Sequence, residues 1–206
     1  MRRIRGILLI VAGLAMSFIA AGMFASYEQQ AEIAGTNAEI LLTTLTEEIK
    51  IREEVIQYDT AVPEEPVAAE PPKVTLAGYD VVGIVRVPSQ GLELPVLDGW
   101  SYDMLQISPC RYSGSVDNGD LIVLGHNYKK HFSPLKKLKA GDAVEFCDVN
   151  GKTYSYSVAK TEILQKTELE RLTTTEHDLT LFTCTNGGYR RFVVRCDLIP
   201  ESPELQ

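Results

Sequence analysis

Cysteine, histidine and tryptophan are scarce in this chain of 206 residues, which contains four Cys, three His and one Trp. No two of its cysteines and histidines have the spacing of a zinc-binding motif, so a structural metal site is not expected. Basic residues form no stripe along the chain, which argues against nucleic acid as a partner. The sequence therefore predicts no metal, no cofactor and no nucleic-acid binding.

The acidic excess is confined to one segment of the chain. The net charge is −8, and residues 28–73, with eleven acidic and three basic side chains, account for all of it. Residues 61–75 are rich in Pro and Glu and lack aromatic side chains. Such a composition predicts an extended linker. The acidic segment is interpreted as a solvated stalk and not as a binding surface.

One long apolar run lies near the N-terminus. Arg2, Arg3 and Arg5 precede residues 7–24, which carry no charge. As a helix this run would measure about 27 Å, close to the ~30 Å hydrocarbon core of a bilayer. Residues 1–26 are predicted to be a single-pass anchor with a cytoplasmic N-terminus and the remainder of the chain outside. A cleaved signal peptide is the alternative, and it too would export the chain.

Between anchor and linker, residues 27–60 place apolar side chains at helical spacing. They predict an amphipathic stalk helix that packs on the domain or self-associates. Residues 76–200 form the predicted folded domain, followed by a tail at 201–206. We expect this domain to fold and remain active without residues 1–72.

From residue 76 onward, short apolar runs alternate with turn residues, which is typical of an all-β fold. Seven or eight closely spaced strands predict a closed barrel or a sandwich. The predicted strands are Val81–Val87, Leu92–Leu97, Leu121–Leu124, Ala143–Cys147, Thr153–Leu164, Leu179–Thr183 and Phe192–Ile199. Short helices are expected at Trp100–Ile107 and Lys166–Leu172 and a helical turn at Phe132–Leu138, while Ser108-Pro109 and Ser113-Gly114 are assigned to loops.

Three chemically able side chains lie at predicted strand ends. Cys184 ends one strand, His126 follows another, and Arg191 opens the last. A thiolate nucleophile needs access and a nearby cation or base, an imidazole can shuttle the proton, and a guanidinium can stabilise an oxyanion. Thr183 and Asn127, beside the cysteine and the histidine, are candidate substrate contacts.

The remaining cysteines and histidines are weaker candidates. Cys110, Cys147 and Cys196 are expected to be small buried apolar side chains. Four cysteines could form two disulfides in three pairings, but a nucleophilic Cys184 must be free. His131 and His177 lie in polar surroundings in the sequence and have no comparable strand-end position.

Together these residues resemble the sortase family. The run Thr180-Leu181-Phe182-Thr183-Cys184 is similar to the family's TLxTC motif, with Gly125-His126 about sixty residues upstream and Arg191 opening the next strand. The resemblance covers 79–200. It implies a cysteine transpeptidase with an eight-stranded β-barrel and short helices, anchored in the cell membrane with the barrel on the outer side. Only six residues separate Cys184 from Arg191, a class B-like feature, whereas the short helix before the cysteine strand is not.

The resemblance also implies roles and partners. Cys184 would cleave a C-terminal, LPxTG-like sorting signal of a secreted protein and form a thioacyl enzyme, His126 would act as general acid and then base, and Arg191 would stabilise the oxyanion. An amine from a cell-wall precursor or a pilin lysine would resolve the intermediate. Two alternatives are a cysteine hydrolase that uses the same site and a non-catalytic exported β-domain that binds wall components and has a buried Cys184.

Overall fold

The computed structural model describes residues 2–56, 71–174, 176–185 and 187–200. The linker at 61–70 and the tail at 201–206 lie outside this part of the chain. The helical elements are α1 (Arg2–Ile56), η1 (Pro88–Gln90), α2 (Tyr102–Leu105), η2 (Ser133–Lys137) and α3 (Leu169–Thr173). The strands are β1 (Val74–Leu76), β2 (Tyr79–Val87), β3 (Leu92–Leu97), β4 (Cys110–Ser113), β5 (Leu121–Gly125), β6 (Ala143–Asp148), β7 (Thr153–Gln165), β8 (Leu179–Cys184) and β9 (Arg190–Leu198).

Eight of these strands close into a barrel. They pair in the order β2-β3-β4-β5-β8-β9-β7-β6, and the pairing of β6 with β2 completes the ring. Strand β1 adds to β2 ahead of β6, because Val74–Leu76 pair with Tyr79–Val81 while β6 pairs with Gly83–Arg86. Most pairs are antiparallel, but β3 pairs with β4 and β5 pairs with β8 in parallel. The expected closed, eight-stranded all-β barrel is confirmed.

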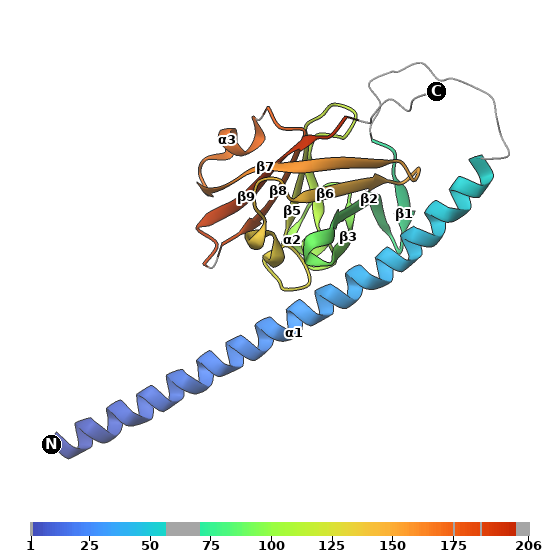
Figure 1. The fold of residues 1–206 in the computed structure, drawn as a ribbon. Coiled ribbons are helices and arrows are strands. Elements are labelled where there is room, and N and C mark those ends of the chain that lie inside the picture. The colour runs from blue at the N-terminus through green and yellow to red at the C-terminus, as the bar shows by residue number, and fades with distance from the viewer. Residues whose placement is uncertain (1, 57–70, 175, 186, 201–206) are drawn as a thin grey trace.

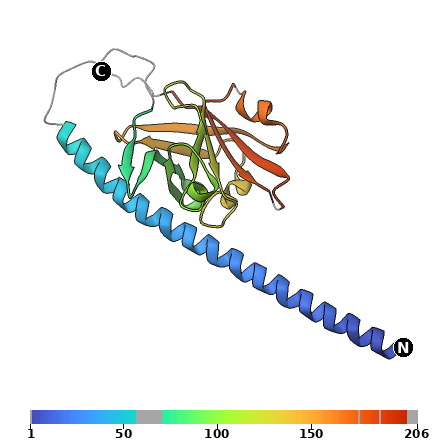
Figure 2. The same ribbon diagram turned by 180° about the vertical axis from the view of Figure 1, so that it is seen from behind.

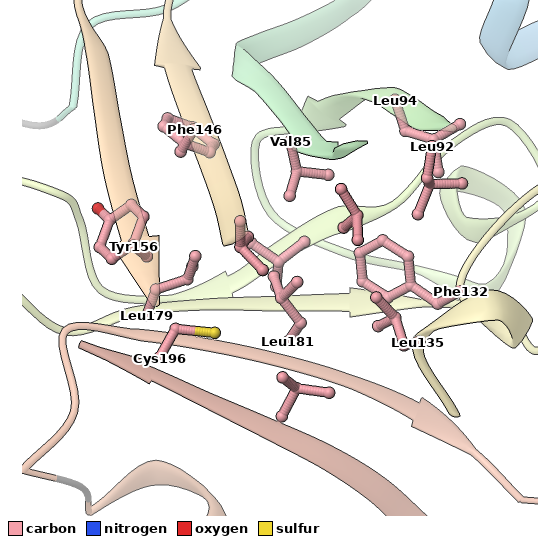
Figure 3. Close-up of a cluster of buried hydrophobic side chains, with 14 of the residues drawn as sticks. Val85, Leu92, Leu94, Phe132, Leu135, Phe146, Tyr156, Leu179, Leu181 and Cys196 are labelled. Carbon is pink, nitrogen blue, oxygen red and sulfur yellow. The ribbon is translucent and has the colours of Figure 1, made fainter. Parts of the chain in front are cut away.

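Alternation along the strands sends one set of side chains into the barrel, where they form its core (Figure 3). One end is filled by the fully buried Phe132 and Leu135 of the η2 turn region. A Cβ atom on Gly125 would lie 2.6 Å from the Phe132 ring, so only glycine fits at this end of β5. The core also includes Val85, Leu94, Val123, Phe146, Tyr156, Val158, Leu179, Leu181, Val194 and Cys196.

A second apolar cluster lies on the outer face of the barrel wall, where α1 packs obliquely across it (Figures 1 and 2). Leu41, Leu45 and Ile49 of α1 are buried there, at helical spacing. The stalk helix therefore packs on the domain, which was one of the two alternatives for it. It is continuous with the predicted anchor segment, because α1 runs without a break from Arg2 to Ile56.

The two halves of α1 differ in environment. Apolar side chains such as Phe18, Met23 and Phe24 are at least 65 % exposed, and the N-terminal part of α1 extends past the barrel (Figure 1). Within the described residues this is the one helix long and apolar enough to cross a membrane. The N-terminal half of the helix is thus apolar and exposed, whereas the C-terminal half packs against the barrel.

Two strands were not anticipated. Val74 and Thr75, assigned to the linker, belong to β1, and the predicted loop around Ser113 includes the end of β4. Strand β1 has only three residues, and β4 (Cys-Arg-Tyr-Ser) has no alternation of apolar and polar side chains. Such strands form because their partners β2 and β5 supply hydrogen bonds. These contacts are tertiary, so the local sequence pattern does not predict them.

Candidate active site

The predicted catalytic residues meet because their three strands are neighbours in the sheet. Gly125 of β5 is in register with Thr183 of β8, so His126 follows next to Cys184. On the other side of β8, Cys184 pairs directly with Arg191 of β9. Residues paired across strands project to the same face of a sheet. The structure therefore brings a thiol, an imidazole and a guanidinium to one end of one wall.

Strand β8 separates the site from the core by alternation. Leu181 and Thr183 face the barrel interior, whereas Phe182 belongs to the outer cluster and Cys184 shares its face. Phe182 is 2 % exposed, but Cys184, at the strand end, is partly exposed. The cysteine is accessible where the covering helices no longer screen the wall, and this disagrees with the alternative of a buried Cys184.

The other cysteines are buried and free, as expected for small apolar side chains. Burial raises the pKa of Cys110 and of Cys196 to about 12. A thiol held neutral in this way is a poor nucleophile. Cys184 is the accessible cysteine of the chain.

His126 is held by side chains from two segments. Its Nε2 lies 3.3 Å from Nε2 of Gln106, just after α2, and its ring centroid is 4.7 Å from that of Tyr128. The Tyr128 hydroxyl donates to Oε1 of the same glutamine at 3.3 Å. Burial lowers the pKa of His126, which favours the neutral imidazole. A neutral ring can accept the proton of a thiol or of an incoming amine.

Arg191 lies against the loop between β8 and β9. Its Nη1 donates to the carbonyl oxygens of Gly188, at 2.9 Å, and Arg190, at 3.3 Å. Its Nε and Nη2 make no hydrogen bond to the described residues, so they can reach a substrate oxygen. Arg190 precedes it on the strand and projects to the opposite face. The preference for Arg191 over Arg190 thus has a geometric basis.

Helix α1 contacts the segment that carries His126, a feature that sequence reasoning missed. The Tyr27 hydroxyl of α1 donates to the carbonyl oxygen of Asn127 at 3.0 Å, and its ring lies edge-on to Tyr128, with centroids 5.3 Å apart. Lys130 pairs with Glu32 of α1 at 2.9 Å. Because Tyr27 and Glu32 lie about a hundred residues from their partners, no local sequence signal marks these contacts.

The two candidate substrate contacts differ. The Thr183 side chain is fully buried and its hydroxyl has no hydrogen-bond partner among the described residues, so its role as a substrate contact stays a prediction that the burial of the side chain does not favour. Asn127 remains a candidate, with its Oδ1 accepting from Nζ of Lys136 at 2.5 Å. Gln106, Tyr128 and Lys136 were not anticipated.

The weaker histidine candidates lie outside the site. His131 is fully buried beneath α1, and His177 pairs with Asp197, with 2.5 Å between Nδ1 and Oδ1. Among the described residues, no group of three or more His, Cys, Asp or Glu side chains could hold a metal ion.

Comparison with known proteins gives the same picture. The Sortase domain family model matches residues 85–199. Sortase A of Bacillus anthracis is 30% identical over an alignment of 146 residues, and the match covers 66% of this chain and 68% of that protein. Sortase D of Bacillus subtilis (strain 168) is 29% identical over an alignment of 112 residues, and the match covers 52% of this chain and 56% of that protein.

Solved structures are similar too. Sortase C1 from Streptococcus agalactiae has a TM-score of 0.53 at 30% identity, covering 58% of this chain and 68% of that one. Clostridium perfringens sortase C, solved with the C-terminal cell wall sorting motif, has a TM-score of 0.53 at 19% identity, covering 88% of this chain and 100% of that one. The second likeness concerns the fold alone.

Proposed function

This chain belongs to the sortase family, whose members are cysteine transpeptidases acting on sorting-signal proteins, and we propose that Cys184, His126 and Arg191 perform its reaction. The observation that carries the proposal is the register of β5, β8 and β9, which gathers the three side chains on one face. The partial exposure of Cys184 gives a substrate access to the thiol.

The reaction proceeds in two halves. In the first, His126 takes the thiol proton, and Sγ of Cys184 attacks the carbonyl carbon of the peptide bond in the sorting signal. Arg191 stabilises the oxyanion, and the imidazolium gives its proton to the departing amine as the C–N bond breaks. A thioester remains. In the second half, His126 takes a proton from an incoming amine, which attacks the thioester carbonyl. The C–S bond breaks, the joined product leaves, and the imidazolium returns its proton to Sγ of Cys184.

We further propose the setting of this reaction. The exposed apolar half of α1 anchors the chain in the cell membrane, with Arg2, Arg3 and Arg5 on the cytoplasmic side and the barrel outside. The acceptor is an amine of a cell-wall precursor or a pilin lysine, and the donor is a secreted protein with an LPxTG-like C-terminal signal. Class membership within the family stays a prediction.

A peptide assay with the full chain in detergent micelles tests the assignment. Fluorogenic LPxTG-like and NPxTx-like peptides are incubated with and without a small amine. We expect cleavage and an amine adduct, no turnover by Cys184→Ala, and a loss of about 10- to 100-fold for Arg191→Lys, which keeps the charge but loses the planar fork. Arg190→Lys is the matched control.

The outcomes separate the alternatives. A cleavage rate and product that do not change when the amine is added indicate a hydrolase. Cleavage that survives Cys184→Ala refutes the assignment of the nucleophile. Equal losses for Arg191→Lys and Arg190→Lys would show that the role of Arg191 is wrong.

A further inference from the structure

The segment that follows His126 concentrates positive charge. Between Asp120 and Asp142 the chain holds five lysines and no acidic residue, whereas the whole chain has a net charge of −8. These lysines define a basic segment, residues 129–139, and all but the second of them are exposed: Lys129, Lys130, Lys136, Lys137 and Lys139. The proposed reaction uses none of them, so the basic segment has room for a different role.

Helix α1 neutralises two of the five charges. Nζ of Lys129 lies 3.9 Å from Oε1 of Glu28, and Nζ of Lys130 lies 2.9 Å from Oε2 of Glu32. The packing is close as well, because a Cβ atom on Gly35 would lie 2.1 Å from Cδ of Lys130. The basic segment is therefore held against α1 both by charge and by shape.

The other three lysines form no ion pair with an acidic side chain of the described residues. Nζ of Lys136 donates to Oδ1 of Asn127, a neutral amide, at 2.5 Å. Asp142 accepts from the backbone N–H of Lys139, at 2.8 Å, and not from its ammonium group. With Lys137 these side chains leave three positive charges on an exposed surface, which favours an anionic partner.

The position of the basic segment along α1 indicates which partner this is. The uncharged apolar run of α1 ends at Phe24, and Glu28, the partner of Lys129, follows four residues later. At ~1.5 Å per residue, Glu28 lies roughly 6 Å beyond the end of the run. A bilayer of ~40–45 Å with a ~30 Å hydrocarbon core has headgroup layers of roughly 5–8 Å on each side. With residues 7–24 in the hydrocarbon core, Lys129 lies at the depth of the headgroups.

Tyr27 places the residues next to His126 at the same depth. It follows Phe24 by three residues, and its hydroxyl donates to the carbonyl oxygen of Asn127 at 3.0 Å. Tyrosine is enriched where a membrane meets water. Because Asn127 also accepts from Lys136, that ammonium group lies on the same side of the barrel. From here toward its N-terminus, α1 extends past the barrel (Figure 1).

We propose that the basic segment is a membrane-surface contact, which binds the anionic phospholipid headgroups of the bilayer that α1 spans. The inference rests on the proposed anchoring of the chain by the apolar half of α1. Basic side chains within a Debye length of an anionic membrane surface are attracted to it. The contact holds the end of the barrel that carries His126 and Cys184 at the membrane surface.

Acetylation of individual lysines in the full chain tests the proposal. The chain is placed in nanodiscs of phosphatidylglycerol or of phosphatidylcholine at equal ionic strength. It is then treated with N-hydroxysuccinimidyl acetate, an uncharged reagent, and each lysine is followed by mass spectrometry. We expect Lys129, Lys137 and Lys139 to react about 3- to 10-fold more slowly in the anionic discs. Added salt should remove the difference, because screening weakens the attraction.

Lys152 is the internal control. It is exposed and lies between β6 and β7, in a turn whose Val149 belongs to the outer cluster that Leu45 and Ile49 cover. Ile49 follows Phe24 by 25 residues, which is roughly 37 Å of helix. The acetylation rate of Lys152 should therefore be the same in both kinds of disc.

Charge reversal makes the test specific. The double variant Lys137→Glu, Lys139→Glu should abolish the lipid-dependent difference at Lys129, because the anionic surface then repels the segment. The matched double variant Lys152→Glu, Lys160→Glu changes the net charge equally and should leave the difference intact. A thermal unfolding scan of each variant checks that the barrel is intact.

Three results would overturn the proposal. The first is equal acetylation of Lys129, Lys137 and Lys139 in both kinds of disc. The second is equal slowing of Lys152 in the anionic discs, which would indicate a general effect of surface charge. The third is a difference at Lys129 that survives charge reversal of the basic segment. Failure of the proposed anchoring is distinguishable, because the chain would then elute apart from the discs at high salt.

Discussion

The inner and outer faces of strand β8 differ in how far their side chains are buried and in the substitutions they should tolerate. The inner face places Leu181 and Thr183 in a closed core, where neither side chain is exposed. The outer face places Phe182 under other side chains and Cys184 at an edge that α1 and the short helices leave open. Six consecutive residues thus serve stability and chemistry through alternation alone, and the chemistry lies where the outer cover ends.

The largest effects should come from truncating one residue on each face. Leu181→Ala leaves a cavity in the core and should lower the free energy of unfolding by about 2–5 kcal/mol. Cys184→Ala removes only a sulfur atom at an edge, so stability should stay within about 0.5 kcal/mol while turnover is lost. Urea unfolding and peptide cleavage measure both. A large loss of stability in Cys184→Ala would show that this edge belongs to the core.

The outer face can be tested through α1. Leu45 is fully buried against the barrel, whereas Ile40 of the same helix is 63 % exposed. Leu45→Ala should destabilise the full chain by about 2–4 kcal/mol, and Ile40→Ala by less than about 0.5 kcal/mol. Similar effects of both would mean that α1 does not dock in solution.

The same contacts bear on the separability of the domain. The sequence predicts that residues 1–72 can be removed, but their removal would expose the outer cluster that Leu41, Leu45 and Ile49 cover. Limited proteolysis of the truncated chain, compared with the full chain, would show whether the barrel keeps its packing. We expect the truncated domain to be less stable, and to lose the Tyr27 contact with the segment after His126.

Local sequence patterns predicted most of the strands, and tertiary contacts explain the strands and site residues that these patterns did not predict. Short apolar runs between turn residues predicted strands such as Leu121–Leu124 and Leu179–Thr183, and the ends of these runs pointed to Cys184, His126 and Arg191. Gln106 and Lys136 reach the site through the packing of α2 and η2 on the barrel, so their neighbours in the sequence give no hint of a role. A pattern can show that a residue ends a strand, but not which distant side chains meet it there.

Acid should lower the free energy of unfolding through His131, which is buried where α1 packs on the barrel. Burial lowers the pKa of this side chain to about 4; a hydrogen bond with the Ala34 backbone opposes this in smaller measure, and the charge of His126 lowers the pKa a little further. The unfolded chain binds this proton near pH 6.5, so stability is fully present above that pH and is lost as pH falls toward 4, by about 3 kcal/mol at pH 4. Unfolding of wild type and His131→Gln between pH 7 and 4.5 measures the slope, which should be smaller in the variant. Equal slopes would show that His131 does not titrate on unfolding.

The smallest expected effect concerns Thr183, where the inner face holds a polar atom. Its hydroxyl is buried without a hydrogen-bond partner, which costs stability. Thr183→Val replaces the hydroxyl by a methyl group of similar size, so the free energy of unfolding should stay level or rise by about 1 kcal/mol. Because the side chain faces away from Cys184, peptide cleavage should be retained.

Thr180→Val is a suitable contrast, since the Thr180 hydroxyl accepts from Nη1 of the buried Arg195 at 2.9 Å and its loss should destabilise the barrel. A fall in turnover for Thr183→Val at unchanged stability would mean that the inner face also takes part in the chemistry, and the division of β8 into two faces would no longer hold.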